Sequence, residues 1–471
     1  MKWTATWESS VLSAEVDRPN ETTILITVAL ATMLAPLNST MIGVALPEIM
    51  REFTTDLSAG SWLVIAYLIT MASLQPVGGK LGDRLGRRPL IIGGLIYFGI
   101  ASVGAAFASS LTELLIFRVQ QGIAGAIALP NGMALMREIV PAERRASRFG
   151  LMGSAIVLAA AAGPPLGGVL IRVAGWRAVF YANLLIVLPA LILALRALPG
   201  MVGERRRQPF DLVGALQLLA LLCGGAILLT GSLQTWPTMG RWGAGAVLAA
   251  LAVHFLWREA RHDDPVFQPR FFRRATFAAA NAGVALSNLA MYTTFLAIPL
   301  LLADLPGWSS TQVGLVLSTL WAPTVFCAPL GGRLADLWGR RWPTCLGLFL
   351  LTVGMATLLL FNNGPDDLWV LLTGLVIAGI GLGLSQAGLQ TAVLESVSRE
   401  QSGSASGIFS TSRYIGSIAG SSALPMLYVV GDRIAAVDGL AGFERVLWVV
   451  VASSLAATVA SLWIQDRPSA A

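Results

Sequence analysis

Two arginines lie inside long apolar runs of the sequence, where a charge is best placed to bind a polar partner. Arg413 lies about 10 residues into its run, roughly 15 Å at the rise of an α-helix, and Arg118 lies about 5 residues from one end of another. If these runs cross a bilayer, a charge at that depth costs about 2.5 to 3.5 kcal/mol, so something must offset it. A bound polar or anionic molecule would do so. The structural alternatives are a helix-end carbonyl for Arg413 and snorkelling to the interface for Arg118.

Uncharged polar side chains also fall within the apolar runs. Each of them could contact a bound molecule or could tie two helices together, because interhelical hydrogen bonds use the same side chains. The set is Asn38, Gln120, Gln121, Asn288, Tyr292, Gln386 and Gln390.

Carboxylates are absent from the centres of these runs. A group that takes up and releases a proton inside a membrane should be a shielded carboxylate or a histidine. Of the 26 acidic residues none lies deep in an apolar run, whereas Glu48, Glu113 and Asp304 lie near the ends of runs. If the protein moves protons, these three are the predicted peripheral carriers.

Little else in the sequence could support covalent or metal chemistry. His254 and His262 are the only histidines, and the three cysteines lie in apolar runs without metal-ligand spacing. There is no phosphate-binding loop of the form GxxxxGK[ST]. We therefore expect no metal and no cofactor, and a membrane-embedded enzyme is a remote alternative.

The composition predicts a polytopic membrane protein. The chain has 471 residues, of which 55% are hydrophobic and only 12% charged, against roughly 25% charged in soluble proteins. Fourteen spans fit the length, and twelve spans with a surface or re-entrant hairpin is the alternative. The predicted helices are 22–46, 58–78, 90–110, 114–136, 147–172, 177–197, the hairpin 210–231 and 242–257, then 275–302, 310–332, 342–361, 368–394, 403–429 and 444–464.

The placement of basic residues predicts the orientation of the chain. When the loops are assigned alternately to two sides, 24 of the 32 lysines and arginines fall on the side that holds both termini, and six fall on the other. Short cytoplasmic loops collect positive charge, so both termini should be cytoplasmic. The net charge of +6 therefore reflects topology, and nucleic acid is not an expected partner. No cleaved signal peptide is evident in residues 1–21.

The chain contains an internal repeat. Gly79 to Arg88, read as GKLGDRLGRR, recurs as GRLADLWGRR from Gly332 to Arg341, an offset of 253 residues. Both copies follow the second helix of a six-helix set. Secondary transporters are commonly built from such repeats, with a central site that opens alternately to either side.

At these residues the sequence resembles the major facilitator superfamily, whose signature motif has the form GxLxDxxGRR. Three further segments resemble its fourteen-helix drug:proton antiporter branch: the first-helix segment LNSTMIGVALP that starts at Leu37, the fourth-helix segment RVQQG that starts at Arg118, and the fifth-helix exporter segment GPPLGG that starts at Gly163. The first-helix motif of that branch usually has an acidic residue where this chain has Asn38. Because an amide cannot titrate, proton coupling is less firmly implied here than for the family.

The resemblance predicts an all-α fold with 14 transmembrane helices, as two six-helix bundles plus two extra helices. The predicted parts are a cytoplasmic segment 1–21, an N-terminal bundle 22–197, a linker 198–273 with the two extra helices, a C-terminal bundle 274–465 and a tail 466–471. The signature motifs should act as a cytoplasmic gate, in which Asp83 and Asp336 face a helix N-terminus of the other bundle or pair with arginine. The gate residues are Gly79, Asp83, Arg84, Gly86, Arg87, Arg88, Gly332, Asp336, Gly339, Arg340 and Arg341. Gly163, Pro164, Gly167 and Gly168 form the exporter motif, which suits a close helix crossing.

The function implied is secondary transport by alternating access, with export of lipophilic or amphiphilic small molecules and proton coupling. A cavity with Arg413 and no deep acid favours neutral, zwitterionic or anionic amphiphiles over strongly cationic ones. The alternative is a lipid or metabolite exporter with weak or no coupling. We expect a monomer in the bacterial plasma membrane, with the substrate, protons and the lipid bilayer as partners.

Overall fold

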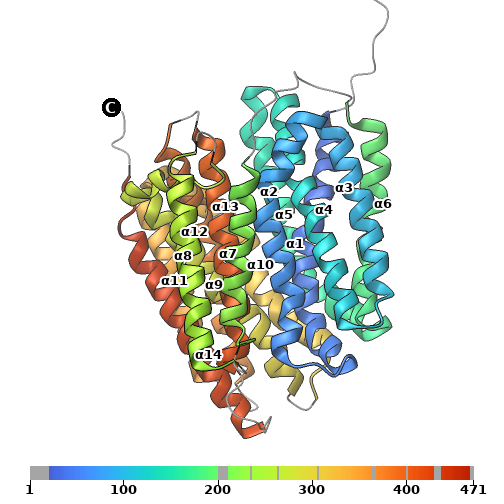
Figure 1. The fold of residues 1–471 in the computed structure, drawn as a ribbon, viewed down its shortest axis with the longest axis vertical. Coiled ribbons are helices and arrows are strands. Elements are labelled where there is room, and N and C mark those ends of the chain that lie inside the picture. The colour runs from blue at the N-terminus through green and yellow to red at the C-terminus, as the bar shows by residue number, and fades with distance from the viewer. Residues whose placement is uncertain are drawn as a thin grey trace, which may run out of the picture.

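The protein is an all-helical bundle (Figure 1). The computed structural model describes residues 21–199, 211–233, 236–262, 265–304, 307–361, 367–398, 401–428 and 436–466. Within those ranges the chain forms fourteen α-helices and two short 3-10 segments, η1 (Pro269–Arg273) and η2 (Leu358–Leu360), and no strand. The helices are α1 (Glu21–Glu52), α2 (Leu57–Leu85), α3 (Arg87–Ala106), α4 (Leu111–Ile139), α5 (Ala142–Ala174), α6 (Arg177–Ala197), α7 (Leu212–Leu229), α8 (Thr238–Glu259), α9 (Ala275–Asp304), α10 (Ser310–Trp338), α11 (Arg341–Thr357), α12 (Leu368–Glu395), α13 (Ser402–Tyr428) and α14 (Ala436–Ser461).

Twelve of these helices are both long enough and apolar enough to cross a bilayer, and the hairpin helices α7 and α8 are among them. The two that fall short in apolarity are α4 and α13, the helices that carry Arg118 and Arg413. With 29 and 27 residues, they still reach about 40 Å, which exceeds the roughly 30 Å of a hydrocarbon core. The predicted fold class, an all-α polytopic membrane protein, is confirmed.

Several helices were predicted to be shorter than they are. The segments 79–89 and 333–341 were predicted as loops, but α2 continues to Leu85 and α10 to Trp338. Helix α8 was predicted to start at Trp242 and to be short, but it has 22 residues from Thr238. The reason is that a helix does not have to end at the membrane surface. Its polar last turns can continue into water with their backbone hydrogen bonds intact.

The first six helices pack mainly among themselves, as do the last six, and we call these sets the N-terminal bundle (α1–α6) and the C-terminal bundle (α9–α14). Helix α7 contacts α2 of one and α13 of the other, whereas α8 packs on α7. Figure 1 shows green α7 between the blue helices of the N-terminal bundle and the red helices of the C-terminal bundle. The hairpin therefore lies at the seam of the two bundles.

The internal repeat recurs in the backbone of the two signature motifs. Gly86 and Gly339 end α2 and α10 with positive φ angles of 94° and 82°, a conformation that favours glycine. The next arginine of each motif pairs with a glutamate in the last turn of the fourth helix of its bundle. Arg87 Nε lies 2.7 Å from Glu138 Oε1, and Arg340 pairs with Glu395 in the same way. In both halves the start of the third helix is thus fastened to the end of the fourth helix.

A second recurring contact joins the first and fifth helices of each bundle. A Cβ atom added to Gly163 would lie 1.9 Å from Oγ1 of Thr40, and one added to Gly420 would lie 2.6 Å from Oγ1 of Thr293. The two glycines are 257 residues apart and the two threonines 253, so the same crossing is built twice. Only a residue without a side chain fits there.

The two bundles meet most closely where α5 crosses α10. A Cβ on Gly168 would lie 2.4 Å from the carbonyl oxygen of Ser310, and one on Gly314 would lie 2.3 Å from that of Pro164. The Thr311 hydroxyl donates to the carbonyl of Gly168 at 3.2 Å. The exporter motif is therefore a backbone-to-backbone contact between the bundles, as the close-crossing prediction required.

The apolar core shows at which face the bundles are joined. We call the face at which α1 begins and α14 ends the terminal face, which is uppermost in Figure 1, and the other the opposite face. In the N-terminal bundle, the core near the opposite face is continuous with the core of the C-terminal bundle. Its core near the terminal face, with Ile24, Leu95 and Ala194, is a separate cluster. The bundles are thus sealed to one another toward the opposite face.

The α5–α10 seam makes a prediction about stability. Gly168→Ala should lower the thermal unfolding midpoint of the purified protein, with an overpacking cost of roughly 1 to 3 kcal/mol, because the methyl group would meet backbone atoms. Gly153→Ala is the matched control on the same helix, since a Cβ there has nothing within 4 Å. It should be neutral or stabilising, because alanine favours a helix over glycine. Equal midpoints for the two variants would contradict a tight seam.

Candidate functional site

Arg118 is fully buried inside the N-terminal bundle. Its Nε donates to the carbonyl of Leu63 at 2.9 Å, its Nη1 donates to Oε1 of Gln121 at 2.8 Å, and its guanidinium lies 4.3 Å from the ring centroid of Tyr67. These partners come from α2 and α4. The snorkelling alternative is therefore wrong for this conformation, because the side chain points across the bundle and its exposed fraction is zero.

The amide of Gln121 extends this contact to two further helices, and Asn183 adds a third. Its Nε2 donates to Oγ of Ser102 on α3 at 2.9 Å, and its Oε1 also accepts from Nδ2 of Asn38 on α1 at 3.2 Å. Asn183 on α6 donates to both Asn38 Oδ1 and Ser102 Oγ, at 3.2 and 3.3 Å. We call Asn38, Ser102, Arg118, Gln121 and Asn183 the N-bundle polar network. It brings two predicted amides together with Arg118, and all its members are buried.

The network compensates the charge of Arg118 with neutral dipoles. Among the described residues, no carboxylate pairs with this guanidinium, and its Nη2 has no hydrogen-bond partner. A buried charge without a counter-ion is tolerated only where oriented carbonyl and amide groups replace water. The position is thus organised for a positive charge that an added anion or a new carboxylate would stabilise further.

A second set of polar groups lies between the two bundles at mid-depth. Ser39 Oγ and Tyr292 OH are 3.4 Å apart, and Gln75 Nε2 donates to Tyr414 OH at 3.1 Å. The first contact joins α1 to α9 and the second joins α2 to α13. Together with Arg413 we call these residues the central belt. Each lies at least ten residues from either end of its helix, so the belt is near the middle of a bilayer.

Arg413 is the charged member of the central belt. It is half-buried, and its guanidinium lies 5.6 Å from the ring centroid of Tyr414. The guanidinium forms no hydrogen bond or ion pair with any described residue, although the backbone carbonyl of Arg413 accepts from the Ser417 hydroxyl. The helix-end carbonyl that would have explained it structurally is not observed. A partly accessible guanidinium flanked by phenol groups can bind an anionic or hydrogen-bond-accepting group.

The remaining predicted amides are not joined to these sets. Asn288 is buried, and its Nδ2 donates to the carbonyl of Val284 in its own helix at 2.8 Å. Gln120 and Gln386 are half-buried and Gln390 is exposed, and no hydrogen bond joins them to another described residue. Their contact with a substrate stays a prediction.

In the first signature motif the carboxylate pairs with an arginine of its own bundle. Arg87 Nη2, at the start of α3, lies 2.9 Å from Oδ1 of Asp83 in the last turn of α2, and its Nε binds Glu138. Arg88 donates to the carbonyl of Leu195 on α6 at 2.8 Å. Of the two partners predicted for Asp83, a helix N-terminus of the other bundle or an arginine, this conformation has the arginine, and that arginine belongs to the same bundle. Gly79 and Arg84 belong to the last two turns of α2.

In the second motif the aspartate is placed differently. Asp336 is exposed on α10, in the same turns as Gly332. Arg340 pairs with Glu395, and Arg341 lies with its guanidinium 5.4 Å from the ring centroid of Trp342. A role of Asp336 as a gate across the bundles stays a prediction.

The three predicted proton carriers lie at helix ends, as the sequence indicated. Glu113 is exposed and acts as a cap of α4, since its Oε2 accepts from the backbone N–H and hydroxyl of Ser109 at 2.8 and 2.9 Å. Glu48 is half-buried near the opposite face, beside Gly175. Asp304 is the last residue of α9, and its side chain lies outside the described residues. Glu113 therefore has a structural explanation, and Glu48 keeps the proton-carrier prediction.

The sequence model of the Major Facilitator Superfamily matches this chain twice, over residues 28–279 and 280–471. The chain belongs to this superfamily. The two matches meet between residues 279 and 280, near the start of α9, the first helix of the C-terminal bundle, which agrees with the repeat observed in the backbone. It is therefore a transporter and not an enzyme.

Known relatives cover nearly the whole chain. The transporter YvkA of Bacillus subtilis (strain 168), named an uncharacterized MFS-type transporter, is 32% identical over 454 residues, which are 96% of this chain and 97% of YvkA. The tetracenomycin C resistance and export protein of Streptomyces glaucescens is 29% identical over 422 residues, 87% of this chain and 76% of that one. The multidrug transporter protein MdtP of B. subtilis (strain 168) is 28% identical over 423 residues, which are 89% of this chain and 77% of MdtP.

Solved structures share the fold. A bacterial homolog of the human lysosomal transporter Spinster, in an inward-facing and unoccupied conformation, matches with a TM-score of 0.68 and 18% identity, over 96% of this chain and 100% of that one. A D-xylose-proton symporter matches with a TM-score of 0.65 and 16% identity, over 95% of this chain and 98% of the symporter. The multi-pass membrane fold of this superfamily member is thus established.

Sequence reasoning missed part of each polar set. Gln75 and Asn183 are amides inside apolar runs, so the signal that singled out Asn38 applied to them as well. Ser102, Tyr67 and Tyr414 carried no such signal, because serine and tyrosine are common in transmembrane helices, and only the packing shows that they face the amides and arginines.

The N-bundle polar network makes a prediction about stability. Asn183→Leu should lower the thermal unfolding midpoint, with a cost of about 1 kcal/mol or more, because it removes the donor to Asn38 and to Ser102 in a buried site. Asn288→Leu is the matched control, because that amide bonds only within its own helix. If Asn183→Leu unfolds no earlier than this control, the network does not hold the bundle together.

Proposed function

We propose that this transporter exports neutral, zwitterionic or anionic amphiphilic small molecules from the cytoplasm by alternating access. The observation that carries the proposal is the central belt. A half-buried guanidinium without a counter-ion among the described residues lies at mid-depth beside Tyr414, whose hydroxyl accepts from Gln75 of the other bundle. A substrate head group can replace the missing counter-ion.

The charges of the described residues support the choice of substrate. No acidic side chain in these ranges forms a hydrogen bond or ion pair with a belt residue, whereas a carboxylate there would favour a cationic drug. Tyr292 and Tyr414 of the belt pack against the apolar core, as expected near the tail of a bound amphiphile. Lipophilic cations are therefore disfavoured by the charge of Arg413.

The packing of the bundles supports a direction of opening. Basic residues concentrate on the terminal face, so we take that face as cytoplasmic. The continuous core and the α5–α10 seam lie toward the opposite face. Rocking of the bundles about the belt would close the terminal face and open the seam, which would release the substrate outside. The structure would then represent the state that loads from the cytoplasm.

The names of two relatives support export rather than uptake. One is a tetracenomycin C resistance and export protein and the other a multidrug transporter, and both are similar to this chain over most of its length. The exporter motif of α5 forms the seam that must open.

The proposal includes proton coupling, but one observation favours an exporter with weak or no coupling. Asn38 occupies the place where the drug:proton antiporters usually have an acid, and its amide is held by Gln121 and Asn183. Export of a lipid or lipophilic metabolite with weak coupling fits this arrangement. Under the proton-coupled form of the proposal, Glu48 is the remaining carrier among the described residues.

The central belt makes a prediction about transport. Arg413→Ala should reduce efflux of an anionic or zwitterionic amphiphile at least tenfold in cells, because the head group loses its charged partner, a loss of about 1.4 kcal/mol or more. Membrane abundance should be normal, since Arg413 makes no ion pair with the protein. Arg413→Lys should keep part of the activity, because it keeps the charge.

The matched control is Arg241→Ala. Arg241 is exposed at the start of α8, where its Nη2 donates to the Thr238 hydroxyl. Its removal should leave efflux unchanged. Full efflux by Arg413→Ala at normal abundance would refute a substrate role for the belt arginine.

Coupling is tested by reconstitution into liposomes with an imposed pH gradient. Asn38→Asp should strengthen the dependence of transport on the gradient, because the new carboxylate would lie beside Gln121, which binds Arg118, and its charge could be neutralised either by this guanidinium or by a proton. Transport by the unaltered protein that ignores the gradient would favour the uncoupled exporter. An unchanged gradient dependence in Asn38→Asp would show that coupling resides elsewhere.

A further inference from the structure

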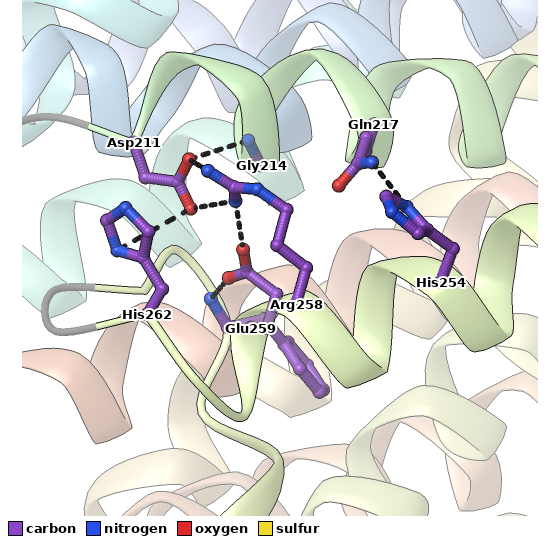
Figure 2. A network of polar contacts seen from close by, with 8 residues as sticks. Asp211, Gly214, Gln217, His254, Arg258, Glu259 and His262 are labelled. Carbon is purple, nitrogen blue, oxygen red and sulfur yellow. Dashed lines mark hydrogen bonds and ion pairs between the residues drawn. The ribbon is translucent and has the colours of Figure 1, made fainter.

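The base of the α7–α8 hairpin holds a compact cluster of charged side chains, separate from the polar sets between and within the bundles (Figure 2). Asp211 precedes α7, Arg258 and Glu259 end α8, and His262 follows three residues later. Figure 2 shows these four side chains pointing toward one another beside Gly214. The transport mechanism proposed above does not use them.

The two carboxylates share one guanidinium. Arg258 binds Asp211 through both terminal nitrogens, with Nη1–Oδ2 and Nη2–Oδ1 distances of 2.6 Å each. The same Nη1 lies 3.1 Å from Glu259 Oε1. The backbone N–H of Gly214 donates to Asp211 Oδ1 at 2.8 Å. The site contains no other close cation except His262, whose Nδ1 lies 4.0 Å from Asp211 Oδ2, within the described part of the chain.

Gly214 brings the two carboxyl groups close to each other. A Cβ atom at this position would lie 2.4 Å from Asp211 Oδ2 and 2.5 Å from Glu259 Oε1. Both side chains are almost fully buried, with exposed fractions of 1% for Asp211 and 0% for Glu259. Two ionised carboxylates at this separation and burial repel strongly, and one guanidinium neutralises only one of them.

Two further described arginines of this region point elsewhere. Arg261 lies with its guanidinium 4.1 Å from the ring centroid of Trp257, and Arg270 donates to the carbonyl of Ala260 at 2.8 Å. His254 bonds Gln217 farther along the hairpin, at 2.9 Å. Within the described part of the chain, one guanidinium therefore faces two buried carboxylates. Because the nearest imidazole is 4.0 Å from Asp211 and partly exposed, a proton on a carboxylate completes the charge balance.

Asp211 is the carboxylate that stays ionised. Burial raises its pKa, but the hydrogen bonds from Arg258 and from the N–H of Gly214 outweigh burial and hold the pKa below its ordinary value. Its position at the N-terminus of α7 favours the negative charge as well. The proton must then reside on its neighbour.

We propose that Glu259 is a proton-binding site, which holds one proton at neutral pH against the Asp211–Arg258 ion pair and exchanges it with the cytoplasmic side. Half-exposed His262 gives water a route to the cluster. Protonated, Glu259 adds no charge to the ion pair. Deprotonated, it would place a second negative charge against Asp211, and the hairpin base would be strained apart.

The position of the site gives the proton a structural consequence. Oε2 of Glu259 accepts the backbone N–H of Phe267 at 2.8 Å, so Glu259 fastens α8 to the connection that leads through η1 to α9. Helix α7 of the same hairpin contacts α2 and α13 of opposite bundles. The protonation state of Glu259 therefore sets how firmly the hairpin is attached at the seam of the two bundles, whatever substrate the central belt binds.

Infrared difference spectroscopy of the full-length protein in lipid bilayers tests the site without a transport assay. On titration between about pH 5 and about pH 9, where histidines and buried carboxyl groups change charge, the unaltered protein should lose the absorption of one buried protonated carboxyl group. The isosteric Glu259→Gln should lack this band. Glu113→Gln, which alters an exposed helix-capping carboxylate, should keep it.

A second variant tests the charge balance itself. Asp211→Asn keeps a residue suited to cap α7 but leaves Glu259 as the one close carboxylate of Arg258 among the described residues, so Glu259 should ionise and its band should be absent at neutral pH. This variant decides the question even if Glu259→Gln does not fold. A neutral-pH band that persists in Glu259→Gln or in Asp211→Asn, or the absence of any such band in the unaltered protein, would overturn the proposal.

Discussion

The charge of Arg118 has to be held inside an apolar bundle without a counter-ion among the described residues, and much of the N-terminal bundle is arranged around this requirement. A guanidinium in a low-dielectric interior needs oriented acceptors to replace water. The carbonyl of Leu63, the amide of Gln121 and the ring of Tyr67 provide them. Because the amide of Gln121 also has to be satisfied, the requirement passes on to Asn38 and to helices α3 and α6.

The two halves share a backbone plan but place their buried charge differently. Both have a positive-φ glycine after the second helix and a glycine-on-threonine crossing between the first and fifth helices. Arg118 is on the fourth helix of its bundle and points inward, whereas Arg413 is on the fifth helix of the other bundle, beside Tyr414, which contacts Gln75 across the interface. The repeat thus provides the scaffold, and its divergence separates a structural charge from one that is accessible to a ligand.

The sequence predicted the fold well because lipid imposes simple rules. Apolar runs located all fourteen helices, and α6 matched at both ends, since every spanning segment must satisfy its own backbone. The ends of α2 and α10 could not be predicted from apolarity, because a helix can continue into water. For the site, the depth of Arg118 and Arg413 was readable, but their partners were not. Whether Gln121 or Gln390 meets another side chain depends on helix rotation, which hydropathy does not specify in helices that are apolar on nearly every face.

The distribution of strong and weak contacts explains how such a fold can rock without unfolding. The ion pairs Arg87–Glu138 and Arg340–Glu395 each join helices of one bundle, so they can persist through a rigid-body movement. The belt crosses between the bundles through neutral hydroxyl and amide groups, whose exchange for water or substrate costs little. The α5–α10 seam is close but consists of glycine and backbone atoms, so its opening releases no buried charge. Rigidity within each bundle and replaceable contacts between them are together what alternating access requires.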